Sequence, residues 1–200
     1  MSEISDKMDE DELKENEEIK GNDISNIEGN FTELGLDERL INGLLKHGFV
    51  KATLIQQKTI PIILNGKDVL LRAKTGSGKT LSYLIPLIQN ILNLEIPDDE
   101  DILSIILAPS RELLIQISNV LNNILINCGE ITHYVLKGFG NNILNNDKIC
   151  LNEKPNIVIS TPSQLALHIK HKNIDIKSVK YIIIDEADII ITNNYLNDVK

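Results

Sequence analysis

Apolar stretches of two kinds alternate between residues 31 and 200. Short apolar runs predict β-strands at 68–72, 102–107, 131–136, 156–159 and 180–184. Apolar residues at helical spacing predict helices at 37–47, 53–64, 80–92, 110–126, 162–170 and 188–198. Strands that alternate with helices are typical of an α/β fold, in which a parallel sheet has helices on both faces. The stretches 95–101 and 138–154, the second rich in asparagine, are interpreted as surface connections.

The first thirty residues have a different composition. They contain eleven acidic residues and three lysines, a net charge of −8, whereas the whole chain carries −9. An acidic segment without aromatic residues cannot bury enough apolar surface to offset the entropy cost of ordering. We therefore expect a disordered acidic tail over 1–30 and a single domain over 31–200.

Other classes of protein are disfavoured by what the sequence lacks. No segment approaches the ~20 apolar residues of a membrane span, and the acidic start lacks the apolar core of a secretory signal, so we expect no membrane association. Cys128 and Cys150 do not have metal-binding spacing and are expected to be reduced, small hydrophobic residues.

Residues 73–80 have the pattern of a phosphate-binding loop between a predicted strand and a predicted helix. Glycines allow backbone N–H groups to close around phosphates, and the helix N-terminus directs partial positive charge at them. We expect Lys79 to reach the β- and γ-phosphates and the Thr80 hydroxyl to hold Mg²⁺. A glycine-rich turn that only begins a helix is the alternative, and Ala73 stands where the general pattern has glycine. The candidate loop residues are Ala73, Lys74, Thr75, Gly76, Ser77, Gly78, Lys79 and Thr80.

An acidic tetrad follows the apolar run Tyr181–Ile184, which predicts a buried parallel strand. Open α/β sheets bind ligands at the carboxyl ends of their strands. Asp185 is therefore the candidate Mg²⁺ carboxylate, and Glu186 the candidate group that orients or deprotonates the attacking water. Alternatively, these acidic residues only begin the next helix, where Asp and Glu are favoured.

The loop A-K-T-G-S-G-K-T and the tetrad D-E-A-D together resemble the motifs of the DEAD-box RNA helicase family. This resemblance implies a RecA-like P-loop NTPase domain with ATP and Mg²⁺ as cofactors. Residues 48–56, G-F-V-K-A-T-L-I-Q, resemble the family's adenine-reading Q motif, with Ala52 in place of the usual proline.

The Q motif implies that Gln56 pairs with adenine, that Thr53 supports Gln56 and that Phe31 stacks on the base. A side-chain amide has one donor and one acceptor to match the adenine edge. Thr53 and Gln56 also have the spacing of a capping box, and both interpretations can hold together.

Three further motifs, at residues 108–113, 137–140 and 160–164, resemble the family's RNA contacts. Each lies where a predicted strand meets a predicted helix, so each is alternatively only a helix cap, whereas the RNA interpretation uses backbone N–H groups and hydroxyls to bind phosphates. Ser163 and Gln164 stand where the third motif usually has glycine and arginine. The candidate RNA-binding residues are Pro109, Ser110, Arg111, Gly138, Gly140, Thr161 and Pro162.

The resemblance covers residues 31–200 and implies a second RecA-like domain outside this chain, to which Asp188 couples. Alone, the chain is expected to bind nucleotide weakly and to turn over negligible ATP. Residues 153–163 resemble the nucleolar subgroup that acts in ribosome biogenesis, which implies pre-ribosomal partners, a monomer, and the nucleolus, with the cytoplasm as the alternative. Two other functions stay open: an ATPase of the same superfamily that acts on DNA, and a non-catalytic module that docks RNA or protein.

Overall fold

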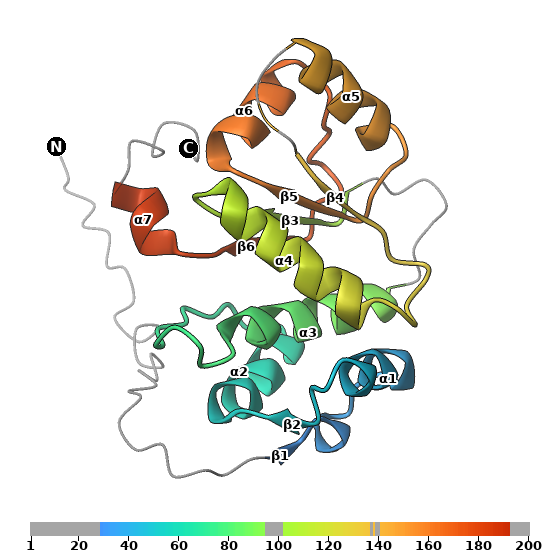
Figure 1. Cartoon of the computed structure of the whole chain (residues 1–200), viewed down its shortest axis with the longest axis vertical. Coiled ribbons are helices and arrows are strands. Elements are labelled where there is room, and N and C mark those ends of the chain that lie inside the picture. The colour runs from blue at the N-terminus through green and yellow to red at the C-terminus, as the bar shows by residue number, and fades with distance from the viewer. Residues whose placement is uncertain (1–28, 95–101, 137, 139–140, 193–200) are drawn as a thin grey trace, which may run out of the picture.

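A four-stranded parallel sheet forms the centre of the domain (Figure 1). The computed structural model describes residues 29–94, 102–136, 138 and 141–192. The strand order is β4–β5–β3–β6, and each neighbouring pair is parallel. The strands are β3 (Ser104–Leu107), β4 (His133–Val135), β5 (Ile157–Ser160) and β6 (Tyr181–Ile184).

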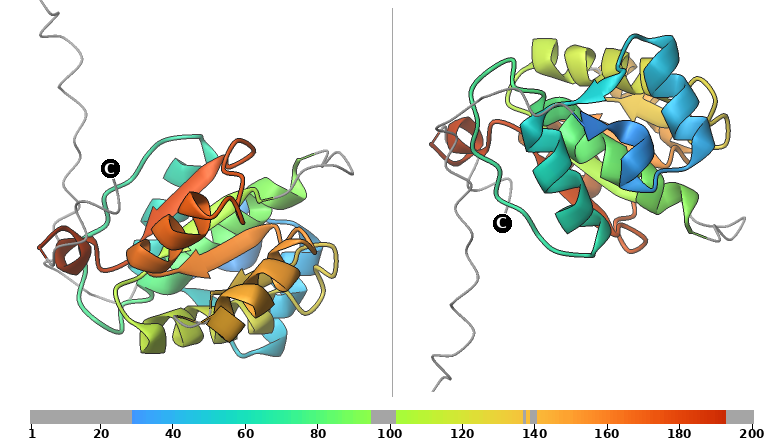
Figure 2. Two further views of the ribbon diagram at one scale, coloured as in Figure 1. Left: turned by 90° about the horizontal axis from the view of Figure 1, so that it is seen from above. Right: turned by 90° about the horizontal axis from the view of Figure 1, so that it is seen from below.

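Helices cover both faces of this sheet (Figures 1 and 2). The larger core cluster joins one face to α1 (Glu38–Lys46), α2 (Leu54–Leu64), α3 (Lys79–Leu92) and α4 (Arg111–Ile124). The smaller cluster joins the other face to α5 (Asn141–Leu151), α6 (Pro162–Lys170) and α7 (Ala187–Thr192). Successive side chains of β3 point to opposite faces of the sheet, so Ile106 belongs to the larger cluster and Ile105 to the smaller. The predicted α/β class is confirmed.

The amino-terminal part of the domain adds small elements that the sequence did not predict. A short antiparallel pair joins β1 (Gly29–Asn30) to β2 (Lys51–Ala52), with the 3₁₀-helix η2 (Phe31–Leu34) between them. Residues 29 and 30 were assigned to the acidic tail, and the rest of that tail lies outside the described residues. No helix in the described ranges has the length and apolar composition needed to cross a bilayer.

The strand predicted at 68–72 is wrong. These residues have no regular structure, and the Leu70 side chain is 93% exposed. The short apolar run lies between the charged residues Lys67, Asp68 and Arg72, and none of the described strands pairs with it. Apolar character alone does not make a strand, since a strand also needs a hydrogen-bonding neighbour.

Burial of β6 on both faces was also predicted wrongly. The strand is parallel to β3, but it lies at an edge of the described sheet, and Ile182 and Ile184 are 67% and 40% exposed. The predicted connection at 138–154 is wrong for a different reason. Its asparagines have low helix propensity, yet residues 141–151 form α5, whose buried Asp147 and Leu151 lie one turn apart.

A cluster of three polar side chains, two of them buried, holds α5 against its neighbours. The Tyr134 hydroxyl donates to Asp147 Oδ1 at 2.7 Å, and both Asp147 and His168 are buried. His168 Nε2 lies 3.4 Å from Asp147 Oδ2 without hydrogen-bond alignment, and the two form an ion pair only when the imidazole is protonated. Burial lowers the pKa of His168, although Asp147 acts in the opposite direction. These contacts join β4, α5 and α6, so polar bonds as well as apolar packing hold this layer.

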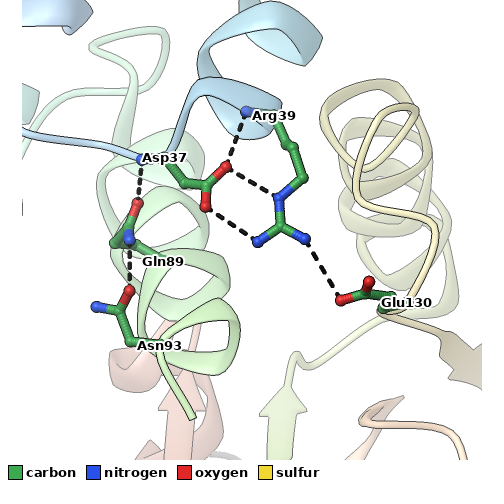
Figure 3. Close-up of polar contacts among 5 residues, drawn as sticks. All are labelled: Asp37, Arg39, Gln89, Asn93 and Glu130. Carbon is green, nitrogen blue, oxygen red and sulfur yellow. Dashed lines mark hydrogen bonds and ion pairs between the residues drawn. The ribbon is translucent and has the colours of Figure 1, made fainter. Parts of the chain in front are cut away.

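A second polar cluster connects the start of α1 with α3 (Figure 3). Asp37 caps α1 by accepting from Arg39 N at 2.8 Å, and its carboxylate also binds the Arg39 guanidinium. The Asp37 backbone N–H donates to Gln89 Oε1 at 2.6 Å, and Gln89 donates to Asn93 at 2.9 Å. Glu130 lies 3.4 Å from Arg39 Nη1. The cluster therefore positions α1 on the helix that begins at the phosphate-binding loop.

We expect Asp37→Ala to lower the free energy of unfolding by about 1 kcal/mol, the usual cost of losing an N-cap side chain. Asp37→Asn should cost clearly less, because asparagine still caps the helix. Hydrogen bonds from Arg39 lower the pKa of Asp37. The charge therefore stabilises the fold above the unfolded-state pKa of aspartate, and this stabilisation is lost as the pH falls through the lower folded-state pKa.

Urea unfolding of the wild type and both variants at several pH values measures these effects. The difference between wild type and Asp37→Asn should shrink towards acid pH. Equal losses for the Ala and Asn variants would show that the charge, and not the cap, carries the effect.

Candidate nucleotide-binding site

The predicted phosphate-binding loop leads directly into α3, whose first residue is Lys79. Gly76 and Gly78 have φ angles of 80° and 95°, the left-handed region that glycine adopts without strain. At Gly78 a Cβ atom would also lie 2.5 Å from Gln56 Nε2, so a larger residue cannot fit without displacing that side chain. The loop thus directs the first free N–H groups of a 14-residue helix towards one place.

Polar groups of the loop fit a bound phosphate. Lys79 Nζ donates to the carbonyl oxygens of Ala73, at 2.7 Å, and Lys74, at 3.4 Å. Ser77 Oγ is buried and has no hydrogen-bond partner among the described residues. Phosphate oxygens would supply acceptors to both groups, so the residues present fit a nucleoside triphosphate.

The predicted adenine-reading residues pack against this loop. Gln56 Oε1 accepts from Thr53 N at 2.9 Å, and Gln56 Nε2 donates to the Gly78 carbonyl at 3.1 Å. The Thr53 hydroxyl donates to the Ser77 carbonyl at 3.0 Å. The capping box at the start of α2 is confirmed. Since Gln56 is only 2% exposed, contact with adenine requires its amide to exchange one of these bonds.

Phe31, the predicted stacking residue, is buried in the core. Its ring is 2% exposed and belongs to the larger core cluster, so it presents no open face to a base in this structure. Its stacking role stays a prediction that requires the ring to be uncovered.

The carboxylates of the acidic tetrad stand at the carboxyl end of β6. Asp185 N donates to the Leu107 carbonyl at 2.8 Å, which extends the pairing with β3 by one residue. Glu186 is exposed, has a φ of 50°, and donates its N–H to Asp185 Oδ1 at 2.9 Å. A left-handed φ is uncommon for a residue with a side chain, and such residues concentrate at functional sites.

One hydrogen bond connects the acidic turn to the loop helix. The Tyr83 hydroxyl, from α3, donates to Asp185 Oδ2 at 2.9 Å. Burial and then the Asp185 charge raise the pKa of Tyr83 far above its ordinary value, so the hydroxyl stays a donor. Our sequence reasoning missed Tyr83. The available signal was its place on α3, three residues after Thr80 and therefore on the same helical face.

The oxygen groups near this bond fit Mg²⁺. The ion prefers oxygen ligands and usually binds through one or two carboxylates, phosphates and water. Thr80 offers a hydroxyl from α3 and Asp185 a carboxylate from the end of β6. A group of three or more His, Cys, Asp or Glu side chains able to hold a metal does not occur in the described part of the chain, and a site of this type does not need one.

The predicted RNA contacts follow β3, β4 and β5, whose carboxyl ends lie at the same edge of the parallel sheet. Ser110 caps α4 by accepting from Leu113 N, and Thr161 caps α6 by accepting from Gln164 N. The helix-cap interpretation is thus confirmed for both residues. Arg111 is exposed, Pro109 is half-buried, Gly138 and Pro162 are buried, and Gly140 lies outside the described residues.

Gln164 faces inward in this structure. In one orientation, its amide donates to the Leu136 carbonyl at 3.1 Å and accepts from Gly138 N at 3.2 Å. The residue that replaces the family's arginine therefore holds the turn after β4. Asp188 lies exposed in the first turn of α7, and its carbonyl accepts from Thr192 Oγ1 at 2.7 Å.

Comparison with known proteins matches residues 53–200 to a family model described as DEAD/DEAH box helicase. The chain belongs to this family. The DEAD/DEAH box model thus covers the phosphate-binding loop, the acidic tetrad and all four strands of the described parallel sheet, and the resemblance seen in the sequence is confirmed.

Named relatives of this DEAD/DEAH box chain are similar over most of its length. A probable ATP-dependent RNA helicase, ddx56 of Dictyostelium discoideum, is 36% identical over 92% of this chain and 27% of that protein. The ATP-dependent RNA helicase DBP9 of Coccidioides immitis is 36% identical over 87% of this chain and 29% of that protein. The chain therefore spans less than a third of the length of these relatives.

The fold has a counterpart among solved structures. A DEAD box protein from the hyperthermophile Methanococcus jannaschii matches with a TM-score of 0.73 and 35% identity, over 86% of this chain and 46% of that chain. This similarity confirms the RecA-like fold class of the DEAD/DEAH box domain.

Proposed function

We propose that this chain is the ATP-binding, amino-terminal RecA-like domain of an ATP-dependent RNA helicase. The observation that carries the proposal is the bond between Tyr83 and Asp185, because it joins the helix of the phosphate-binding loop to the acidic turn. The proposed domain covers residues 31–200, preceded by an acidic tail.

In this proposal, each polar group near the loop has a role in binding or hydrolysing ATP. Lys79 and the N–H groups of residues 74–80 bind the phosphates, and Gln56, Thr53 and Phe31 bind the adenine. Thr80 and Asp185 hold Mg²⁺, which supplies charge neutralisation at the β- and γ-phosphates when bound. Glu186 accepts a proton from the attacking water or orients it, and its exposed position after Asp185 supports this role.

RNA binds in this proposal at the carboxyl edge of the sheet, through groups that do not read bases. Arg111 supplies an exposed charge, and the N-termini of α4 and α6 supply partial charge to phosphates. Pro109, Ser110, Thr161 and Pro162 shape those two turns, and Gly138 and Gly140 the turn after β4.

A second RecA-like domain in the parent protein completes the mechanism. ATP and RNA bind jointly between the two domains, Asp188 transmits the nucleotide state, and short duplexes are parted as the strand bends. The parent protein is proposed to act as a monomer with pre-ribosomal partners in the nucleolus. The resemblance of residues 153–163 supports the location.

ATP turnover tests this function directly. The assay compares the present chain with a protein extended through the downstream coding sequence, each with and without single-stranded RNA. We expect RNA-stimulated turnover by the extended protein alone. RNA-stimulated turnover by the short chain would overturn the two-domain mechanism. Equal stimulation by DNA would favour a DNA-acting ATPase, and absence of nucleotide binding by both proteins would favour a docking module.

A further inference from the structure

We propose that Tyr83 is a positioning residue for the Mg²⁺ site, and that its hydroxyl holds Asp185 where the carboxylate can receive the ion. This inference rests on the proposed Mg²⁺ role of Asp185 and Thr80. Tyr83 lies outside both the phosphate-binding loop and the acidic tetrad. Tyr83 OH and Asp185 Oδ2 are 2.9 Å apart, although 102 positions separate the two residues in the chain.

The Tyr83 hydroxyl is placed between the two proposed protein ligands of the ion. It donates to Asp185, and its own helix carries Thr80 three residues earlier. Thr80 and Tyr83 are one turn apart on α3, whose buried residues hold the helix firmly in the larger core. A rigid helix thus carries a group that reaches across to the acidic turn.

Asp185 depends on this contact because its own element offers little support. It follows the strand at an edge of the described sheet and precedes Glu186, whose φ is 50°. Among the described residues, its Oδ1 accepts only from the next backbone N–H. In the described part of the chain, Tyr83 is the one side chain that hydrogen-bonds Asp185. Loss of the hydroxyl would therefore free the carboxylate to rotate.

Hydrogen bonds to an ionised carboxylate are among the stronger hydrogen bonds in proteins. Groups that orient a metal ligand typically change metal affinity by 10- to 100-fold when they are removed. We expect Tyr83→Phe to raise the Mg²⁺ concentration at half-saturation by about 10-fold. The aromatic ring stays in place in this variant, so the packing of Tyr83 against the larger core cluster is retained.

Binding of a fluorescent adenine nucleotide to this chain, titrated with Mg²⁺ and repeated in EDTA, gives a measurement independent of catalysis. Tyr83→Phe should raise the Mg²⁺ midpoint and leave the affinity in EDTA unchanged. Tyr134→Phe is the matched control, because it removes a similar tyrosine–aspartate bond at the opposite edge of the sheet. It should leave the Mg²⁺ midpoint unchanged.

The inference is overturned if Tyr83→Phe leaves the midpoint unchanged or lowers it, since a lower midpoint would mean that the hydroxyl competes with the ion. It is also overturned if Tyr134→Phe has an equal effect, or if the affinity in EDTA falls as much. Asp185→Asn distinguishes failure of the Tyr83 inference from failure of the proposed Mg²⁺ role of Asp185. A raised midpoint in Asp185→Asn but not in Tyr83→Phe removes the inference alone, whereas an unchanged midpoint in Asp185→Asn removes the proposed Mg²⁺ role.

A double variant keeps the test decisive if Tyr83→Phe also alters stability. Tyr83→Phe should have no further effect on the midpoint in the Asp185→Asn background, because its partner is already changed. An additional increase there would show that Tyr83 acts through the general fold, and it would overturn the positioning role.

Discussion

Lys79→Ala is expected to weaken ATP binding by about 100-fold or more. The Lys79 ammonium now donates to two loop carbonyls, at 2.7 and 3.4 Å, and in the proposed complex it donates to phosphates instead. Each hydrogen bond to a charged group contributes about 1.5–3 kcal/mol, so two such bonds correspond to at least two powers of ten in affinity. Isothermal titration of the variant with ATP and Mg²⁺ measures the loss.

Lys67→Ala is a suitable control for this experiment. It removes the same charge from an exposed residue in the segment that leads into the loop, without touching the proposed phosphate contacts. Its ATP affinity should stay within about threefold of the wild type, which is less than 1 kcal/mol. Equal affinity of wild type and Lys79→Ala would show that the nucleotide binds elsewhere.

Glu186→Gln is expected to leave ATP binding unchanged and to lower turnover by at least about 100-fold in the protein extended through its second domain, the lower end of the range for general acid–base groups. Glutamine keeps the shape of glutamate but cannot accept the proton from water. The Glu186 side chain is exposed and follows Asp185 directly, so the substitution preserves the neighbouring carboxylate.

Single-turnover hydrolysis and nucleotide binding, measured on one preparation, separate the two effects of Glu186→Gln. Glu153→Gln, an exposed glutamate before β5, removes the same charge and should keep full turnover. A Glu186→Gln protein that hydrolyses ATP at the wild-type rate would refute the assigned role.

Local signals in the sequence were enough for several elements and failed where distant contacts decide. The apolar spacing and the glycine before Lys79 predicted α3 almost to the residue, because caps and periodicity are local properties. The exposure of β6 and the absence of a strand at 68–72 depend on which strands lie beside each segment. The helix α5 was missed because burial of Asp147 and Leu151 compensates for poor helix formers.

The same distinction applies to the site. Two separate local motifs predicted the site residues, Lys79 and Thr80 from the loop and Asp185 from the acidic tetrad, and the DEAD/DEAH box model covers both motifs. The contact of Tyr83 with Asp185 could not be predicted from spacing, since it joins residues that only the sheet brings together. Burial of Phe31 and the two bonds of the Gln56 amide likewise follow from packing around the loop.

The edge position of β6 gives the two halves of the proposed site unequal resistance to local opening. Lys79 and Thr80 begin a helix with nine buried residues, so they change position only when that helix moves in the core. Asp185 and Glu186 follow a strand that pairs on one side within the described sheet. Low-energy fluctuations can therefore move the carboxylates while the phosphate-binding loop keeps its form. In this fold, the groups proposed for hydrolysis are the adjustable half of the site, and those proposed for phosphate binding are the fixed half.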